Sequence, residues 1–220
     1  MGVYKQGIAG PFSGKVGSII GSRWRKISYM RGIARKNHKP ASPAQLLQRK
    51  KFQIMSDFLL GISPLFNRSY SQENTSRKSA YHIALSYHLK YAFTMWDGLP
   101  EIDFTKVVLS RGNLPKPLDA RAECTPDKNI MVIWSPLIRT SFVSPDDKAM
   151  IVIYNSQDKI FIVNSKHSRK EGQALVKIIR HWHDHPLHIF IFFSSDEGNN
   201  SPSHYLGVRR INPETETENL

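Results

Sequence analysis

The sequence predicts an α+β fold: an N-terminal β-hairpin and two helices, followed by an antiparallel β-sandwich. The main evidence is a change of hydrophobic period. Between residues 43 and 94 apolar residues recur at helical spacing, whereas from Ile102 onward they alternate with a period of two. A chain of 220 residues can form one large or two small domains, and its 40% hydrophobic content is typical of folded proteins.

The N-terminal hairpin is predicted from the stretch "GPFSGKVGSIIGSRWRKISYMRG", residues 10–32. β-Branched and aromatic residues alternate from Lys15 to Ile20 and from Arg23 to Arg31, and Gly21 and Ser22 are the expected turn between them. Alternation along the second run predicts two faces: Trp24, Lys26, Ser28 and Met30 on one, and Arg23, Arg25, Ile27, Tyr29 and Arg31 on the other.

The glycines of this stretch do not form a nucleotide-binding motif. A Walker loop needs a glycine five residues before Gly-Lys and a Ser or Thr after it, but Ala9 and Val16 occupy those positions. The dinucleotide fingerprint needs a strand before the glycines and a helix after them, and neither is predicted here.

Two helices are predicted after the hairpin. Ser42 is a suitable N-cap and Pro43 a suitable first helical residue, and an apolar stripe continues through about Leu60. The stripe consists of Leu47, Ile54, Met55, Phe58 and Leu59, which leaves Gln48, Arg49, Lys50 and Gln53 outside it. Residues 62–76 are rich in turn formers, and Arg77 to Thr94 is the second predicted helix.

Short strands fill the C-terminal half. The predicted strands are Asp103 to Ser110, Leu118 to Cys124, Ile130 to Trp134, Ala149 to Tyr154, Lys159 to Val163, Ala174 to Ile179, His188 to Phe193 and His204 to Ile211. Such spacing indicates a β-sandwich, in which Trp134 would be buried between two sheets. The domains expected are therefore a basic hairpin and helical region (1–111), a sandwich (112–211) and an acidic, disordered tail (212–220).

Positive charge is concentrated near the N-terminus. Residues 1–56 hold twelve of the 31 Lys and Arg residues and none of the 18 Asp and Glu residues, although the net charge of the chain is +13. Such a region attracts polyanions such as nucleic acid, an acidic membrane surface or an acidic protein, but it can also be a solvated basic face. The candidate polyanion-binding residues are Lys15, Arg23, Trp24, Arg25, Lys26, Arg31, Arg35, Lys36, Lys39, Arg49, Lys50 and Lys51.

No catalytic constellation is evident, so we expect no enzyme, no cofactor and no small-molecule substrate. In "HWHDHPLH" the weak metal candidates are His181, His183 and His185, but Pro186 interrupts the run and no second cluster of carboxylates accompanies it. Asp146 and Asp147 suit a turn. Cys124, the sole cysteine, is expected to be a small core residue; it precludes an intrachain disulfide, which fits the cytoplasm or a particle assembled there.

Two resemblances add to this prediction. "LPKPLDARAECTPDKNIMVIWSP" resembles the first strands of a fibronectin type III or immunoglobulin-like sandwich. The ordered motifs "GPFSGKVGSIIGSRWRKISYMRG", "PASPAQLLQRKKF", "EIDFTKVVLSRGNLP", the Trp134 strand, "DDKAMIVIYN" and "HYLGV" are similar to an uncharacterised Bacteroidetes family, a domain of unknown function. That resemblance implies the same architecture and no established activity. The glycine-rich front with "PAQLLQRKKF" also resembles phage-type structural proteins.

The sequence therefore predicts a non-enzymatic interaction or assembly protein that contacts a protein partner, or another copy of itself, through its basic N-terminal region. DNA or RNA is the alternative partner, because aromatic residues between cations can stack bases while the cations neutralise phosphates. A metal-dependent enzyme is a third hypothesis. The longest apolar stretch, Ile189 to Phe193, is far shorter than the roughly 20 residues that cross a membrane, so no membrane span is expected.

Overall fold

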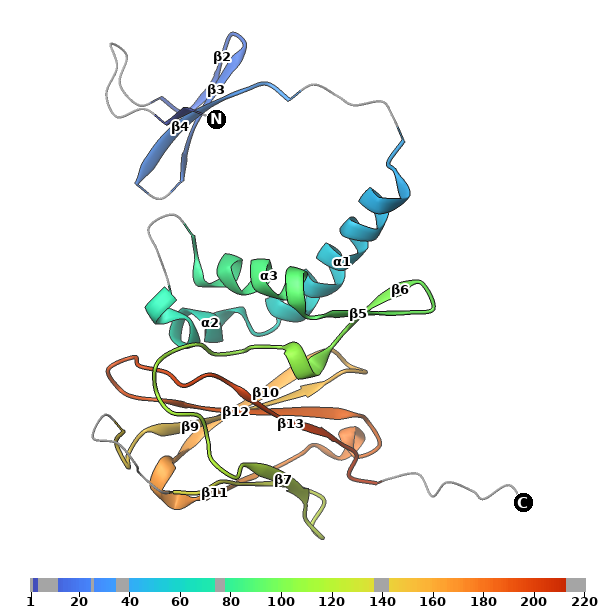
Figure 1. Cartoon of the computed structure of the whole chain (residues 1–220), viewed down its shortest axis with the longest axis vertical. Coiled ribbons are helices and arrows are strands. Elements are labelled where there is room, and N and C mark those ends of the chain that lie inside the picture. Colours follow the sequence, from blue (N-terminus) through green and yellow to red (C-terminus); the bar gives the residue numbers. More distant parts are fainter. Residues whose placement is uncertain are drawn as a thin grey trace.

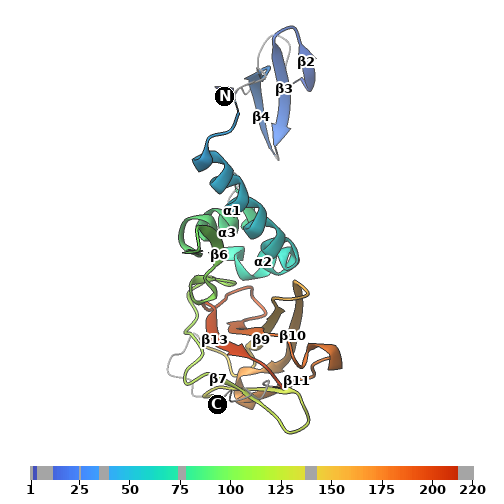
Figure 2. The same cartoon turned by 90° about the vertical axis from the view of Figure 1, so that its right-hand side faces the viewer.

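Three layers make up the body of the protein (Figure 1). In the computed structural model, which describes residues 2–3, 12–24, 26–34, 40–73, 78–136 and 143–212, helices cover one face of a four-stranded sheet and a three-stranded sheet covers the other. A small N-terminal sheet lies beyond the helices, at one end of the long axis, and the turned view in Figure 2 shows the same order.

The middle sheet is buried on both faces. Its strands β9 (Lys148–Asn155) and β12 (Leu187–Ser194) pair antiparallel between β10 (Ile160–Ser168) and β13 (His204–Arg209). Every residue of β9 after Lys148 is buried. A strand covered on both sides is apolar at consecutive positions, which explains the uninterrupted runs AMIVIY and IFIFF.

The third layer consists of β7 (Arg121–Cys124), β8 (Ile130–Ile133) and β11 (Gln173–Val176), in the order β11-β8-β7. It shares one apolar core with the middle sheet. Trp134 is 2% exposed in this core, as the sequence predicts, and its indole N–H donates to the Arg169 carbonyl oxygen at 2.8 Å. The prediction for Cys124 is wrong, because this residue is exposed.

Helices α1 (Pro43–Leu60), α2 (Ser63–Ser69) and α3 (Ala80–Tyr91) form the first layer. The predicted start of α1 is confirmed: the Gln45 N–H donates to the Ser42 Oγ at 3.3 Å, and the Ser42 N–H donates to the Gln45 side chain at 3.1 Å. The buried stripe of α1 joins a core with Val152, Tyr154, Phe190 and Phe192 of the middle sheet.

The N-terminal region is a four-stranded sheet and not a single hairpin. Its strands are β1 (Gly2–Val3), β2 (Gly14–Val16), β3 (Ile19–Trp24) and β4 (Ile27–Gly32), in the order β1-β4-β3-β2. The predicted turn at Gly21 and Ser22 is wrong. Gly21 lies inside β3. A Cβ at this position would come within 2.6 Å of the Phe12 ring, so the glycine allows the close approach of Phe12 instead of forming a turn.

Three further predictions of secondary structure need correction. The described residues form three α-helices instead of two, because α2 lies in the segment predicted as turns. The second predicted helix, Arg77 to Thr94, corresponds to α3 but ends at Tyr91, and a hairpin of β5 (Phe93–Trp96) and β6 (Leu99–Ile102) follows it. The predicted strand from Asp103 to Ser110 is instead a short 3-10 helix, Phe104–Lys106, and an irregular segment. The N–H of Leu109 donates to the Ser203 Oγ at 2.9 Å, so a side chain replaces a strand neighbour.

Candidate polyanion-binding surfaces

One face of the N-terminal sheet combines cations with aromatic rings. The strand register pairs Ile20 with Lys15 and Arg31, and Ser22 with Tyr29. Trp24 shares this face because alternate residues of β3 point the same way. The predicted grouping of Trp24 with Met30 is wrong, and so is that of Arg23 with Tyr29 and Arg31. Trp24 pairs with Ile27 across a two-residue turn, which shifts the alternation by one residue.

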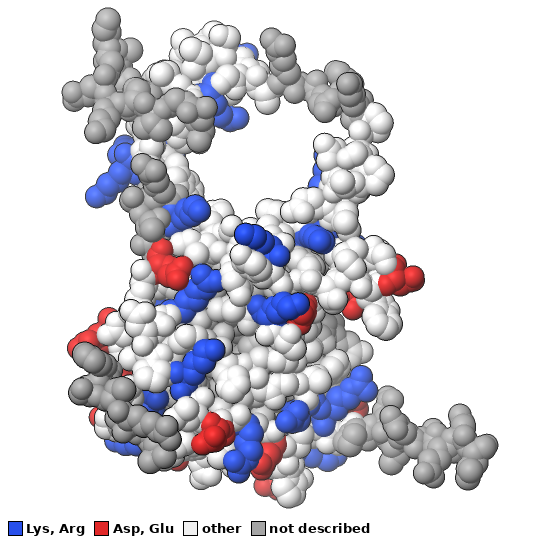
Figure 3. Space-filling view, viewed as in Figure 1, with Lys and Arg blue, Asp and Glu red and all other residues white. Residues whose placement is uncertain are grey.

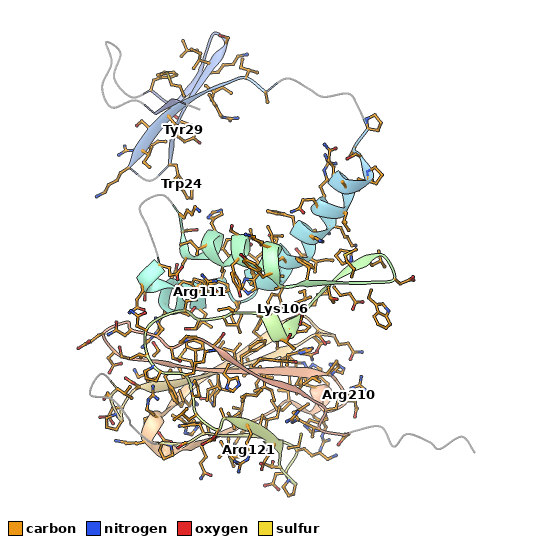
Figure 4. The ribbon with its side chains drawn as sticks, in the orientation of Figure 1. Trp24, Tyr29, Lys106, Arg111, Arg121 and Arg210 are labelled. Atoms are coloured by element: carbon orange, nitrogen blue, oxygen red, sulfur yellow. The ribbon has the colours of Figure 1, made fainter. Side chains whose placement is uncertain are left out.

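The described candidate residues of this sheet are largely exposed. Lys15, Arg23, Lys26 and Arg31 are exposed, and Trp24 is 43% exposed with its ring 6.1 Å from that of His82. Figure 4 shows Trp24 at the end of the sheet nearest the helices and Tyr29 higher on the sheet. Four further candidates lie outside the described residues: Arg25, Arg35, Lys36 and Lys39.

The three candidates on α1 do not form one surface. Arg49 and Lys50 are exposed, as predicted, whereas Lys51 is half-buried with its ammonium 5.7 Å from the centre of the Phe93 ring. Successive helical residues point about 100° apart, so three consecutive cations face different directions. Lys51 thereby lies next to a second basic surface, which the sequence analysis missed.

This second surface is a groove between α3 and the segment 104–111, here called the α3 groove. Its lining consists of Tyr87, Lys90, Tyr91, Phe93, Thr105, Lys106, Val108 and Arg111, and it encloses about 930 Å³. Three of these side chains are cations, three are aromatic and none is a carboxylate. Figure 3 shows Lys and Arg side chains over this face, and Figure 4 places Arg111 and Lys106 below α3.

The cations of the α3 groove lie against aromatic rings and near two carboxylates. The Arg111 guanidinium is 4.2 Å from the centre of the Tyr87 ring, and the Lys90 ammonium is 5.0 Å from that of Tyr91. Arg111 Nη1 lies 3.5 Å from Glu73 Oε2. Lys106 Nζ lies 2.8 Å from Asp103 Oδ2, and its hydrogen bond lowers the pKa of that carboxyl.

A buried histidine holds the wall of the α3 groove in place. His88 Nε2 accepts a hydrogen bond from the Val108 N–H at 3.0 Å, and Nδ1 lies 2.7 Å from the Ala84 carbonyl oxygen. These contacts require a neutral ring with the proton on Nδ1. Burial, assisted by the positive charge of Arg111, lowers the pKa of His88 to about 4. Tyr70 fixes the same segment, because its hydroxyl donates to the Val108 carbonyl oxygen at 2.7 Å.

Protonation of His88 should destabilise the fold in acid. The pKa of His88 is about 4 in the folded chain against an ordinary 6.5, so the unfolded chain binds more protons between these pH values. We therefore expect the free energy of unfolding to be lower at pH 4.5 than at pH 7, with a contribution of about 2–3 kcal/mol from this ring.

Urea unfolding of the wild type and of His88→Gln at both pH values measures this contribution. Gln can still accept from the Val108 N–H but does not titrate, so the variant should lose less stability on acidification. His188, with its pKa also lowered to about 4 by burial, remains as an internal source of acid sensitivity in both proteins. An identical loss in the two proteins would contradict the role assigned to His88.

The histidine-rich segment forms a hydrogen-bonded cluster around Asp158. The Asp158 Oδ2 lies 3.3 Å from His181 Nε2 and 3.7 Å from His185 Nδ1, and the Asn155 amide bridges Asp158 and His185. His183 is buried, and its carbonyl oxygen accepts from two backbone N–H groups. In the described part of the chain, no three His, Cys, Asp or Glu side chains are arranged to hold a metal ion.

Comparison with known proteins places the chain in a family without assigning an activity. Among the helices that the structure describes, none has the length and hydrophobicity to cross a membrane. No curated protein and no solved structure matches the chain. A family model matches residues 11–207, most of the sequence, and the chain therefore belongs to the family of unknown function DUF6266.

Proposed function

We propose that the protein is a non-enzymatic interaction or assembly protein that docks on another protein subunit through its basic N-terminal sheet. The observation that carries the proposal is that the described residues of this sheet form no apolar core of their own. Within β2, β3 and β4 only Gly21 is buried among the described positions. Neither apolar core contains a described residue before Met55. Small sheets usually need packing against another element to be stable, and a partner subunit would supply it.

Exposed aliphatic side chains on this sheet favour a protein partner over nucleic acid. Val16 and Ile19 pair directly in the register and are 63% and 42% exposed. Ile33, which follows β4, is 43% exposed, and its N–H donates to the Ser18 carbonyl oxygen next to this pair. Phosphates and bases would leave such side chains in contact with water, whereas an apolar protein surface would bury them. Arg23 lies on the same face as Ile19, because alternate residues of β3 point the same way, and adds electrostatic attraction to an acidic partner surface.

A second copy of the chain offers a complementary surface. Carboxylates of the segment before β9 and of the turn after β12 lie around one groove, which includes Asp146, Asp196 and Glu197. The side chains of Asp146 and Asp196 are 70% and 78% exposed, so their contacts with Lys170 and Lys148 are weak surface ion pairs. Docking of the basic sheet on this surface would be head-to-tail and could generate a ring or a filament. Such a role includes that of a phage-like structural component.

The sandwich is proposed to be the docking module that carries this sheet, with a fibronectin type III or immunoglobulin-like topology. The strand order supports this assignment. Of the seven strands from β7 to β13, the first, second and fifth form one sheet, and the third, sixth and seventh form the other with β10 at its edge. Immunoglobulin-like domains divide their strands in this way.

Light scattering at low and high micromolar concentration tests the assembly. We expect the mass to rise with concentration, and Ile19→Asp to reduce this rise because a carboxylate would be buried at the interface. Leu99→Asp is the matched control, because Leu99 is a 62% exposed aliphatic residue of the β5–β6 hairpin. The mass of a single chain at every concentration would contradict self-assembly, and so would an equal effect of the two variants.

Nucleic acid is the second candidate partner of the N-terminal sheet. The shared face of Lys15, Trp24, Tyr29 and Arg31 favours it, because cations beside aromatic rings are typical of single-strand binding surfaces. Binding would weaken steeply with salt as counterions are released, whereas the burial of aliphatic side chains in a protein interface tolerates salt. Binding of a labelled oligonucleotide at low and high salt, measured beside light scattering of the protein alone in the same buffers, separates the two.

A further inference from the structure

We propose that the α3 groove binds single-stranded nucleic acid, with phosphates on its cations and a base against Tyr91. This site lies outside the basic N-terminal segment and does not depend on the docking proposed for the N-terminal sheet. The first step of the argument is its charge. Lys90, Lys106 and Arg111 line the groove, and Lys51 extends the positive charge past the Phe93 ring. Asp103 and Glu73 pair with Lys106 and Arg111 from outside the lining, so Lys90 and Lys51 leave the surface with a net positive charge.

The arrangement of the side chains suits an extended polyanion. On α3, Tyr87, Lys90 and Tyr91 are three and four residues apart and therefore lie on one helix face, so rings and a cation alternate along it. A single strand likewise alternates planar bases with phosphates. The carboxylates of an acidic peptide could pair with the cations, but a peptide does not present a planar ring at every repeat as a single nucleic-acid strand does. Duplex DNA keeps its bases stacked and so presents none to the rings.

The ring best placed to receive a base is that of Tyr91. Its side chain is 47% exposed, and Tyr87 packs on it with ring centres 4.9 Å apart. Tyr87 is half-buried and stacked on Arg111, which makes it a support for the neighbouring ring. A base stacked on an aromatic side chain contributes about 1–3 kcal/mol by alanine substitution, so one exposed ring has a measurable effect.

The groove is formed before any ligand arrives. The segment that carries Arg111 is tied to α3 by the hydrogen bond from the Val108 N–H to His88, and the Arg111 N–H donates to the Ser69 carbonyl oxygen at 3.0 Å. Rigid walls reduce the entropy lost on binding. Further Lys and Arg side chains lie on the same face beyond the groove (Figure 3).

Fluorescence anisotropy with a labelled oligo(dT) of about twelve nucleotides tests the site, since a strand of this length covers a typical single-strand site. We expect Tyr91→Ala of the full chain to bind about tenfold more weakly and Tyr91→Phe to bind as the wild type does, because Phe keeps the ring. Lys90→Ala should make the negative slope of log K against log salt shallower by about 0.7, the value for one lost phosphate contact on a single strand.

Two controls make the test specific. Lys170→Ala removes an exposed cation on another part of the surface and should leave binding unchanged. Arg31→Ala removes a cation of the N-terminal sheet and should affect binding less than Tyr91→Ala does. If a Tyr91 variant loses its native circular dichroism, Lys90→Glu, at an exposed position, gives the same test.

Several outcomes would overturn the proposal. These are the absence of oligo(dT) binding at low salt, binding that is lost with Arg31→Ala but kept with Tyr91→Ala, and equal displacement of the oligonucleotide by duplex DNA. Binding of polyglutamate that weakens to the same extent with Tyr91→Ala would show that the groove accepts an acidic protein segment instead. Failure of the light-scattering test would not affect this result, because the two experiments concern different surfaces.

Discussion

Replacing Arg169 by Ala is expected to lower the free energy of unfolding by about 3–5 kcal/mol, because it leaves a buried carboxylate without its counter-charge. Arg169 and Asp147 are 3% and 2% exposed in their side chains, and Arg169 Nε lies 3.4 Å from Asp147 Oδ2. The guanidinium also lies 3.6 Å from the centre of the Phe193 ring, so the substitution removes a contact with the core as well.

Urea unfolding at two pH values measures this loss and identifies its cause. Burial raises the pKa of Asp147 and the charge of Arg169 opposes that rise, so removing the arginine should raise this pKa further. A protonated Asp147 no longer needs a counter-charge. The defect of Arg169→Ala should therefore be smaller at pH 4.5 than at pH 7, because a folded-state pKa above the unfolded value costs stability as the pH rises.

A neighbouring ion pair supplies the control. Lys170 Nζ lies 2.7 Å from Asp146 Oδ1, and these two residues are the sequence neighbours of Arg169 and Asp147. The side chains of Lys170 and Asp146 are both more than half exposed. Lys170→Ala should be close to neutral, because water screens such pairs. An Arg169→Ala protein as stable as Lys170→Ala would contradict the argument. If Arg169→Ala does not fold, the double variant with Asp147→Ala should restore folding, because no charge then remains buried.

Replacing Phe192 by Ala is expected to cost about 3–5 kcal/mol of the free energy of unfolding, and replacing Phe193 a similar amount. The two residues are adjacent in β12 and point to opposite faces of the middle sheet, yet neither is exposed. Phe192 packs in the core beneath the helices, and Phe193 packs in the core shared with the three-stranded sheet. In a sheet with one face in water, one of the two substitutions would be nearly neutral.

Chemical denaturation gives the free energy of unfolding of the two variants, and so tests the packing on each face of the middle sheet. Ile160→Ala is the control, because Ile160 is 52% exposed at the start of the edge strand β10, and surface changes usually stay within about 0.5 kcal/mol. If Phe192→Ala behaved like this control while Phe193→Ala was destabilised, the helices would not pack on the sheet in solution as the structure shows.

Signals between close neighbours in the sequence were enough to predict many of the elements. The start of α1 was predicted from Ser42 and Pro43, which are adjacent in the sequence, and Gln45, three residues after Ser42, completes the cap in the structure. Seven of the eight predicted strands overlap strands of the structure, because β-branched and aromatic runs between turn residues specify them locally. The basic character of the N-terminal region is likewise a property of the sequence alone.

Which side chains of the N-terminal strands share a face could not be predicted in the same way. Treating Arg23 to Arg31 as one strand put Arg23 and Arg31 on one face, whereas the register pairs Trp24 with Ile27 and so places Arg23 and Arg31 on opposite faces. One residue of shift moves every side chain to the other face. The glycine was a misleading signal, since it marks a close approach of Phe12, and such an approach appears only once the chain is folded.

Composition, capping and hydrophobic period thus determined where most helices and strands form and where the charge lies. Tertiary structure alone decided which distant residues meet: the pairing of Arg169 with Asp147, the burial of both faces of β12, and the meeting of Tyr91 with Arg111 in one groove. The physical reason is that propensities act over a few neighbouring residues. A buried pair or a groove, in contrast, arises from the packing of segments whose contact leaves no periodic trace in the sequence.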